Sequence, residues 1–342
     1  MKKRSRPNIF DLARVTGISR GTISRAFNNK PGINAKTQEK ILKAAKEIGY
    51  TPHNGARMMK LGRTGRWGLL LPHLQNPYYA ELVEVLNSHA NALGTMILLG
   101  LSNHDKDREA NLIMQWTAGE TDGLILDQAH YHANPQLFEQ LKAREIPMVF
   151  LHGTPIPGFD FVRYQLYDSV LRIMNQLDAL GHSEIGYVGQ SFAFCRKTAR
   201  FRAYADFHKS KGRKLNEGLI HFGEDGAQGG INAFRAWHSQ GKLPTAVVCC
   251  DDIIACGVVQ GARSSGLQIP RDISVTGVDD IAESARLGLT TIRTDRNATA
   301  RAIFELLESR RENFDRPAEV REIPSELIMR DSFGKPRLAK AS

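Results

Sequence analysis

Short, continuous apolar runs recur along the chain from residue 67 onward, with polar stretches of helical pattern between them. Such runs are typical of parallel strands in a sheet that helices cover on both faces, because both rows of side chains are then buried. The runs are GLLL (68–71), TMILLGL (95–101), GLIL (123–126), PMVFL (147–151), IGYVG (185–189), AVVCC (246–250) and ISVTGV (273–278). The sequence therefore predicts a doubly wound α/β body. Because this many strands would make a large single sheet, we expect two smaller lobes with a cleft between them.

The first 50 residues have a different pattern, which predicts short helices. Gly17 marks a tight turn, and Ser19 is placed to cap a second helix over residues 20–27. Ile23 and Ala26 share one face of that helix, because residues three apart in a helix are neighbours. A helix, a tight turn and a second helix in this order predict a helix-turn-helix.

A third helix is expected to close this module. Asn34 is its capping candidate, and Gly49 marks its end. Four apolar residues are expected to point into the core: Ile41, Leu42, Ala45 and Ile48. The module is therefore predicted to be all-α, with a small core of its own.

Charge is distributed unevenly between these two regions. Residues 1–66 contain 16 Lys and Arg against three acids, a net charge of +13, whereas the remainder contains 30 bases against 33 acids, a net charge of −3. A compact cationic module on a near-neutral body is typical of nucleic-acid binding, although an anionic membrane surface would attract it too.

Other features of the sequence limit location and chemistry. No run reaches the roughly 18 apolar residues of a membrane span, and the basic start MKKRSR lacks the apolar region of a signal peptide. The four cysteines form no CxxC pair, which argues against a zinc site or a disulfide framework. No P-loop, GxGxxG, HExxH or GxSxG motif occurs, which is weak evidence against an enzyme. We therefore expect a cytoplasmic, nucleoid-associated protein with no metal and no cofactor.

The polar face of the second predicted helix carries Arg20, Gly21, Ser24 and Arg25. A basic helix face is usually only a solvated surface. Here the helix follows a tight turn inside a strongly cationic module, which favours a helix that reads the major groove of DNA.

Two long stretches of this region resemble a known family. NIFDLARVTGISRGTISRAFNN (8–29), followed by INAKTQEKILKAAKEIGYTPHNGARMM (33–59), is similar to the DNA-binding region and hinge of the lactose-repressor (LacI/GalR) family of bacterial transcription regulators. Further along the chain, four segments are similar to that family's effector-binding core and stand in the expected order: NPYYAELVEVLN (76–87), DALGHSEIGYVG (178–189), the D-D-x-x-A run at 251–255 and GLQIPRDISVTGVDD (266–280).

The resemblance implies a domain organisation. An all-α, three-helix DNA-binding headpiece is expected over residues 1–52 and a hinge that folds on DNA over 53–65. A two-lobed α/β core like a periplasmic sugar-binding protein is expected over 66–334, with a tail over 335–342. The core is expected to bind the effector and to form the dimer.

The resemblance also implies roles for residues of the headpiece. Arg20 and Gly21 match the two variable base-reading positions of the recognition helix, and Thr22, Ser24 and Arg25 lie on its more constant part. Since Gly21 has no side chain, base specificity is expected to lie mainly at Arg20.

In the hinge, Met59 matches a leucine that wedges into the minor groove at the centre of the operator. An unbranched thioether can also unstack a base step. The alternative is that Met58 and Met59 only pack hinge against hinge. Asn34 and Ala56 complete the residues expected at the DNA.

In the core, four charged residues match effector-contacting positions of the family: Asp168, Arg200, Asp251 and Asp279. Carboxylates accept hydrogen bonds from sugar hydroxyls, arginine donates a rigid fork, and Tyr78 or Tyr79 could stack on an apolar sugar face. For Asp251 and Asp279, helix capping is the competing role.

The function expected from the resemblance is a sequence-specific transcription regulator, a repressor that binds pseudo-palindromic operator DNA as a homodimer. A small-molecule effector, a sugar or sugar derivative bound between the core lobes, would control it. The alternative is a sugar-converting enzyme with a nucleic-acid-binding module, because a carboxylate-rich cleft could also perform acid and base chemistry.

Overall fold

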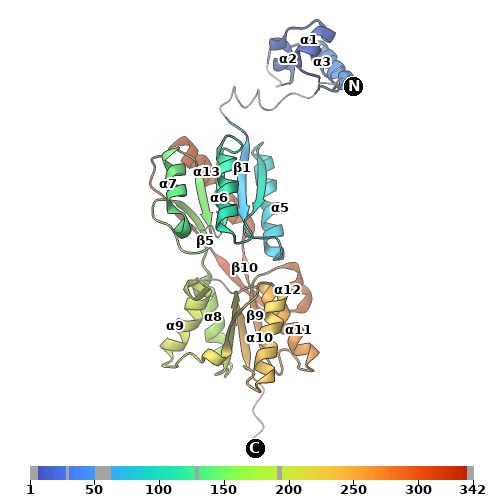
Figure 1. Ribbon diagram of the computed structural model, residues 1–342. Coiled ribbons are helices and arrows are strands. Elements are labelled where there is room, and N and C mark those ends of the chain that lie inside the picture. Colours follow the sequence, from blue (N-terminus) through green and yellow to red (C-terminus); the bar gives the residue numbers. More distant parts are fainter. Residues whose placement is uncertain (1–6, 28–30, 51–62, 128–130, 191–194, 337–342) are drawn as a thin grey trace, which may run out of the picture. The chain divides into compact units, whose positions relative to one another are not determined.

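The computed structural model describes residues 7–27, 31–50, 63–127, 131–190 and 195–336. The chain separates into two compact units, residues 1–64 and residues 65–342. The first unit contains helices, and the second contains two α/β lobes (Figure 1).

The helices of the first unit are α1 (Ile9–Thr16), α2 (Arg20–Phe27) and α3 (Ala35–Ile48). Their ends follow the expected caps. The backbone N–H of Thr22 donates to Oγ of Ser19 at 3.2 Å, and that of Thr37 donates to the side chain of Asn34 at 2.7 Å. Gly17 and Gly49 end α1 and α3 in the left-handed region, with φ of 69° and 71°, where glycine has no Cβ to clash. The predicted helix-turn-helix is confirmed.

A small apolar core joins the three helices. Leu12, Ile23 and Ile41 are fully buried in it. The prediction that Leu42 points inward is wrong, because this side chain is 45% exposed and Ala44 is buried instead. The inward face of α3 runs from Ile41 through positions three, four and seven residues later, and Leu42 lies about 100° away from that face.

The first lobe is a six-stranded parallel sheet between two layers of helices. Its strands, in spatial order, are β11 (Val320–Ile323), β5 (Asp160–Tyr164), β4 (Met148–Leu151), β3 (Gly123–Asp127), β1 (Arg66–Leu71) and β2 (Met96–Leu101). Its helical elements are α5 (Pro77–Ala92), α6 (Lys106–Thr117), the 3₁₀ turn η1 (Tyr131–Ala133), α7 (Pro135–Ala143) and α13 (Arg296–Glu312).

The second lobe repeats this plan with an antiparallel strand at one edge. Its strands, in spatial order, are β12 (Ser325–Ile328), β10 (Thr290–Thr294), β9 (Ser274–Asp279), β8 (Ala246–Cys249), β6 (Ile185–Gln190) and β7 (Ile220–Gly223), with β12 antiparallel to β10. Its helical elements are α8 (Leu166–Ala179), η2 (Cys195–Lys197), α9 (Ala199–Ser210), η3 (Glu217–Leu219), α10 (Ala227–Ser239), α11 (Asp252–Ser264) and α12 (Ala282–Leu287). The predicted two-lobed α/β body is confirmed.

All seven predicted apolar runs form strands, but the sequence did not indicate β5, β7, β10, β11 or β12. β5 contains Asp160, whose charge interrupts the apolar pattern. In the structure this buried carboxylate pairs with Arg310 and Arg316, at 2.9 and 2.8 Å. A strand can therefore hold a buried charge when its partners come from distant parts of the chain.

The chain passes between the lobes after β5, after β10 and between β11 and β12. Figure 1 shows β5 and β10 close to the junction. Asn76, beyond the carboxyl end of β1, donates a 3.5 Å hydrogen bond to Asp279 at the carboxyl end of β9. The carboxyl ends of the two sheets therefore face each other across the junction, where α/β folds bind ligands.

Among the residues with a described structure, none of the helices combines the length and the apolar character that a membrane span requires.

Candidate DNA-reading helix and interlobe cleft

One face of α2 is open to solvent. Arg20, Gly21 and Arg25 are exposed and Thr22 and Ser24 are partly buried, whereas the opposite face packs into the core. A Cβ added at Gly21 would have only Oγ of Ser19 near it, at 3.9 Å. Packing within the headpiece therefore does not require glycine at this position, and the missing side chain leaves a gap in the reading face.

Arg20 has an aromatic partner in the headpiece. Its guanidinium carbon lies 4.6 Å from the centre of the Phe10 ring, and that ring is 61% exposed. A cation–π contact of this kind restricts the arginine without withdrawing it from solvent. Asn34 is exposed and caps α3. Ala56 and Met59 lie outside the described residues.

A cavity of about 300 Å³ lies between the lobes of the core. The six residues expected to contact an effector all line it: Tyr78, Tyr79, Asp168, Arg200, Asp251 and Asp279. The two tyrosines come from the first lobe and the four charged residues from the second. The structure thus brings together residues that lie up to 201 positions apart in the sequence.

Helix starts place most of these side chains. Tyr78 and Tyr79 lie in the first turn of α5, where Asn76 accepts a hydrogen bond from the backbone N–H of Tyr78 at 3.0 Å. Asp168 lies in the first turn of α8 and Arg200 in that of α9. Unpaired N–H groups at a helix start favour oxygen-rich ligands.

Asp251 has both of the roles that the sequence left open. Its Oδ1 accepts a 2.8 Å hydrogen bond from the backbone N–H of Ile254 and so caps α11. Its Oδ2 accepts from Gln190 at 3.3 Å and lies at the cavity. Asp279, in contrast, caps no helix, because the N-cap residue of α12 is Ile281 and this helix has no side-chain cap. Its φ of 113° is unusual for a residue with a side chain.

Burial changes the ionisation of these groups. It raises the pKa of the Asp251 carboxyl, and it raises that of Asp279 well above its usual range, with further contributions from the negative charges of Asp252 and Asp251. Arg200 opposes both shifts. A ligand that donates hydroxyl groups to these carboxylates would replace the water that they lose.

The sequence did not indicate a hydrogen-bonded chain in the wall of the cavity, three of whose residues line it: Tyr78, His152 and Tyr164. The hydroxyl of Tyr78 lies 2.8 Å from that of Tyr164 and donates to Nε2 of His152 at 2.9 Å, and Nδ1 of His152 donates to Asp127 at 2.6 Å. This chain fixes the ring of Tyr78. The only available signal was position, because His152 directly follows the apolar run 147–151.

Comparisons with known proteins agree with this architecture. The family described as bacterial regulatory proteins, lacI family, matches residues 8–53, and a periplasmic binding protein-like domain matches residues 174–333. The transcriptional repressor PurR of Pasteurella multocida is 26% identical over 328 residues, which are 95% of this chain and 98% of that protein.

Two solved structures are similar in fold. The Lac repressor dimer bound to operator and the anti-inducer ONPF has a TM-score of 0.80 at 22% identity, covering 96% of this chain and 99% of that one. The complex of the transcriptional regulator CelR with cellobiose has a TM-score of 0.69 at 22% identity, covering 96% of this chain and 100% of that one.

The two family matches fall on the two units of the structure, one on the helix-turn-helix and the other on the core. The match to the repressor PurR extends over nearly the whole length of both proteins. The alternative of a sugar-converting enzyme is therefore wrong. The chain therefore combines a helix-turn-helix of the lacI family of bacterial regulatory proteins with a periplasmic binding protein-like core, and it is a DNA-binding transcription regulator.

Proposed function

We propose that the interlobe cavity binds a carbohydrate or carbohydrate derivative, which controls DNA binding by the headpiece. The observation that carries this proposal is the convergence of Arg200, Asp251 and Asp279 on one small cavity whose opposite wall holds two tyrosine rings. Such a cavity offers hydrogen-bond acceptors, a fixed donor fork and apolar ring faces together.

A polyol matches this set of groups. Its hydroxyls can donate to Asp251 and Asp279 while its oxygens accept from Arg200, and its C–H face can lie against Tyr79. The similar CelR protein was solved as a complex with a sugar, cellobiose. This supports the same ligand class here.

We further infer that the headpiece over 1–52 reads DNA and that the hinge over 53–65 orders on it. Arg20 would supply base contacts, Thr22, Ser24, Arg25 and Asn34 would support them, and Ala56 and Met59 would act in the minor groove. Binding would take place in the cytoplasm, at the nucleoid. Repression is the expected outcome, because a bound dimer blocks the operator to other proteins.

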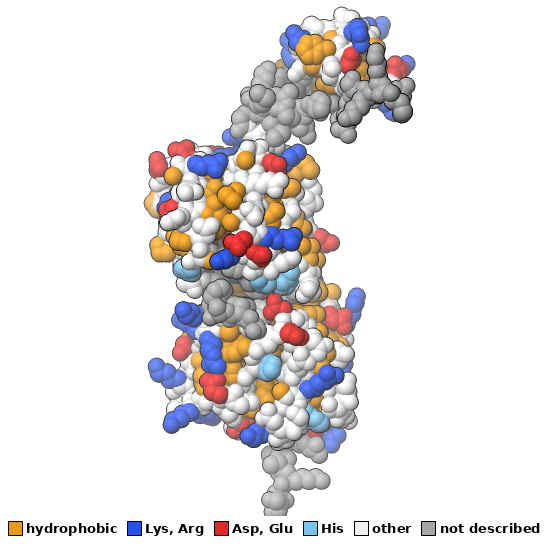
Figure 2. Space-filling model, in the orientation of Figure 1, with side chains coloured by type: hydrophobic (Ala, Val, Ile, Leu, Met, Phe, Trp, Pro, Cys, Tyr) orange, Lys and Arg blue, Asp and Glu red, His pale blue; other side chains and the backbone are white. Residues whose placement is uncertain are grey.

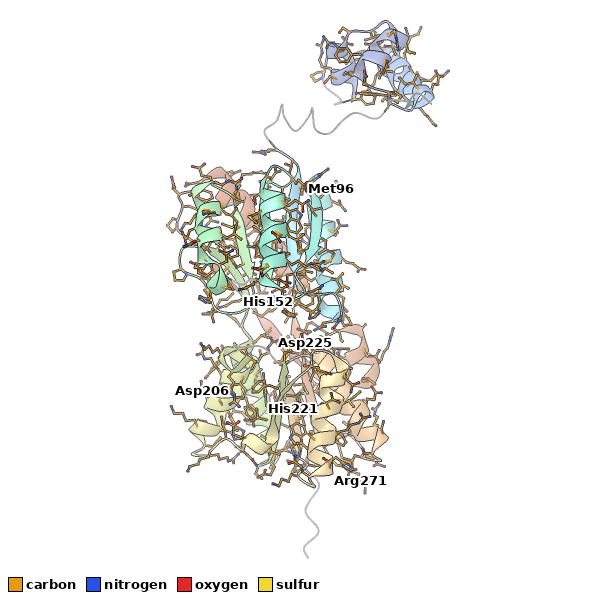
Figure 3. The ribbon with its side chains drawn as sticks, viewed as in Figure 1. Met96, His152, Asp206, His221, Asp225 and Arg271 are labelled. Atoms are coloured by element: carbon orange, nitrogen blue, oxygen red, sulfur yellow. The ribbon has the colours of Figure 1, made fainter. Side chains whose placement is uncertain are left out.

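We propose that the dimer interface lies along one edge of the first lobe. β2 is the edge strand of its sheet, and Met96 on it is 59% exposed (Figure 3). Leu93, Leu99 and Met114 are also exposed large apolar side chains. Single exposed apolar residues are ordinary, but several beside an unpaired strand edge favour a second copy of the chain as the partner.

Effector and DNA must then be coupled. If the effector favours one arrangement of the lobes, it changes the affinity for DNA, and DNA changes the affinity for the effector by the same factor. The dimer is the unit that transmits this change, since two headpieces must fit two half-sites at once.

A thermal-shift screen tests the ligand class. The purified full-length chain would be screened against sugars, sugar phosphates, nucleobases and amino acids, because a ligand of the native state raises the melting temperature. We expect members of the carbohydrate sets to raise it and to change binding to an operator found by selection from random DNA. A response to nucleobases or amino acids alone would overturn the proposal.

A further inference from the structure

Three side chains outside the cavity meet where the two lobes come together. His73 follows β1 and His104 follows β2, both in the first lobe, whereas Asp225 follows β7 in the second. Figure 3 shows Asp225 at the junction, and Figure 2 shows histidine side chains at the edge of the first lobe above acidic side chains of the second. None of these three residues lines the effector cavity.

Two of the distances within this group match those between ligands of one ion. Nε2 of His104 lies 3.5 Å from Oδ2 of Asp225, Nε2 of His73 lies 3.6 Å from the same oxygen, and one ligand atom from each residue lies within 4.8 Å of the others. Both contacts are longer than the usual 2.7–3.2 Å of an N–H···O hydrogen bond. Two ligands of a tetrahedral Zn²⁺, each about 2.1 Å from the ion, are separated by about 3.4 Å.

Backbone hydrogen bonds hold the two histidines beside each other. The N–H of Ser102 donates to the carbonyl of Leu71 at 2.9 Å, and that of Asn103 donates to the carbonyl of Pro72 at 2.8 Å. The loops that carry His73 and His104 are thus joined, and the two imidazole centres lie 5.5 Å apart. His104 itself has a φ of 59°, a left-handed conformation that side chains rarely adopt.

The surroundings of these three side chains leave their nitrogen and oxygen atoms available to bind an ion. His73 is 14%, Asp225 26% and His104 40% exposed, so the group lies near the surface and can exchange an ion with solvent. Within the described residues, Nδ1 of His73 is buried without a hydrogen-bond partner. Neither nitrogen of that ring is therefore held in a hydrogen bond of ordinary length.

We propose that His73, His104 and Asp225 bind one divalent transition-metal ion, with Zn²⁺ the best match, and that this ion links the two lobes. Two imidazole nitrogens and one carboxylate oxygen suit Zn²⁺, Ni²⁺, Cu²⁺ or Co²⁺, whereas Mg²⁺ and Ca²⁺ prefer oxygen ligands alone. Water would fill the remaining position.

The ion acts as a second effector that does not depend on the ligand class of the cavity. Its ligands come from both lobes, so it binds most tightly to the arrangement in which they are close. Tyr79, in the cavity wall, packs its ring at 89° against that of His73, with centres 5.3 Å apart. The metal site and the effector cavity thus share a wall, and occupancy of one changes affinity at the other.

Metal binding by the full-length chain tests this site directly, without effector or DNA. Zn²⁺ would be titrated in competition with a chromophoric chelator, and Co²⁺ binding would be followed by its visible absorption. We expect one ion per chain and a cobalt spectrum without a thiolate charge-transfer band, since the cysteines do not take part. A strong thiolate band, or no stoichiometric binding at micromolar metal, would overturn the proposal.

Variants locate the site. His104→Gln and Asp225→Asn should each weaken Zn²⁺ binding at least about 10-fold, because each removes one of three protein ligands. His104 is 40% exposed and lies in a loop, so this substitution disturbs the packing little. His238→Gln, which removes an exposed histidine on the helix that follows Asp225, should bind zinc as the parent does. Equal affinity in all three variants and the parent would mean that this group is only an ion pair between the lobes.

Discussion

Arg200 and Cys250 are joined by a hydrogen bond in which Nη1 of the arginine donates to the backbone carbonyl of Cys250 at 2.8 Å. The bond ties the start of α9 to the end of β8. It also fixes the direction of the guanidinium, which is otherwise free to turn about a long side chain. Arg200 lines the cavity together with Asp251 and Asp279.

Replacing Arg200 with alanine should abolish the response to the effector, because the ligand loses the guanidinium that lies beside Asp251 and Asp279 in the cavity. Operator binding by the ligand-free protein should remain, since the headpiece is a separate unit. DNA binding titrated with the effector measures both. Arg235→Ala, at an exposed position of α10, is the control. A normal response in Arg200→Ala would make Arg200 a structural residue.

Arg20→Ala should relax sequence preference at one base pair of each half-site and cost about 1–3 kcal/mol of specific binding. Its guanidinium is exposed, stacked on Phe10 and able to form two hydrogen bonds to guanine. Selection from random DNA followed by binding measurements at fixed salt would detect the change. Arg14→Ala removes another exposed charge, on α1, and should weaken binding without altering the preferred sequence.

The buried carboxyl of Asp252 should make stability depend on pH. Burial raises its pKa from 3.8 to about 7, although hydroxyls of Ser284 and Thr291 and the N–H of Ile281 donate to it. The folded protein then keeps a proton that the unfolded chain releases above pH 3.8. The free energy of unfolding should therefore fall as the pH rises from about 4 to about 7, by about 1.4 kcal/mol per unit of pKa shift.

Urea unfolding at a series of pH values measures this dependence. Asp252→Asn should flatten the curve between about pH 4 and 7, since an amide does not titrate. Asp107→Asn, at an exposed position of α6, should leave the slope as it is in the parent. Parallel curves for the parent and Asp252→Asn would show that another group causes the dependence.

Asp160→Asn should lower the free energy of unfolding by about 3–5 kcal/mol, because it leaves the buried guanidinium of Arg310 without its counter-charge and leaves Arg316 with Glu319 alone. Glu322→Gln is the matched control on the neighbouring strand β11. It breaks an ion pair with Arg163 in which both side chains are about 40% exposed, so the loss should stay below about 1 kcal/mol. Chemical denaturation of both variants would show equal losses if burial were unimportant.

The local sequence pattern predicted those helices and strands whose formation depends on residues close by in the chain. The seven apolar runs became strands, and Ser19, Asn34 and Gly49 act at the ends of helices as expected, because caps and buried strands depend on near neighbours. β5 and β10 were missed because Asp160 and Arg293 break the pattern. The partners that accommodate these charges become visible only in the folded chain.

The functional sites also contain some residues that the sequence could indicate and others that it could not. The cavity residues stand in motifs of the family, so the sequence could indicate them one by one. His152, Asp127 and Tyr164 carry no motif, and their hydrogen bonds to one another and to Tyr78 join three strand ends. The group formed by His73, His104 and Asp225 comes from three separate loops, with no ligand spacing that a sequence could show.

Each lobe is completed by a part of the chain that the ribosome makes late. β11 and β12, the edge strands of the two sheets, lie within residues 320–328. The three helices of the headpiece lie within the first 50 residues, so they can form early in synthesis. Both sheets, in contrast, lack an edge strand until residues 320–328 have been made. A chain truncated before residue 320 would thus contain the helix-turn-helix and two lobes with incomplete sheets. Loss of this one short segment would therefore remove an edge strand from both sheets at once.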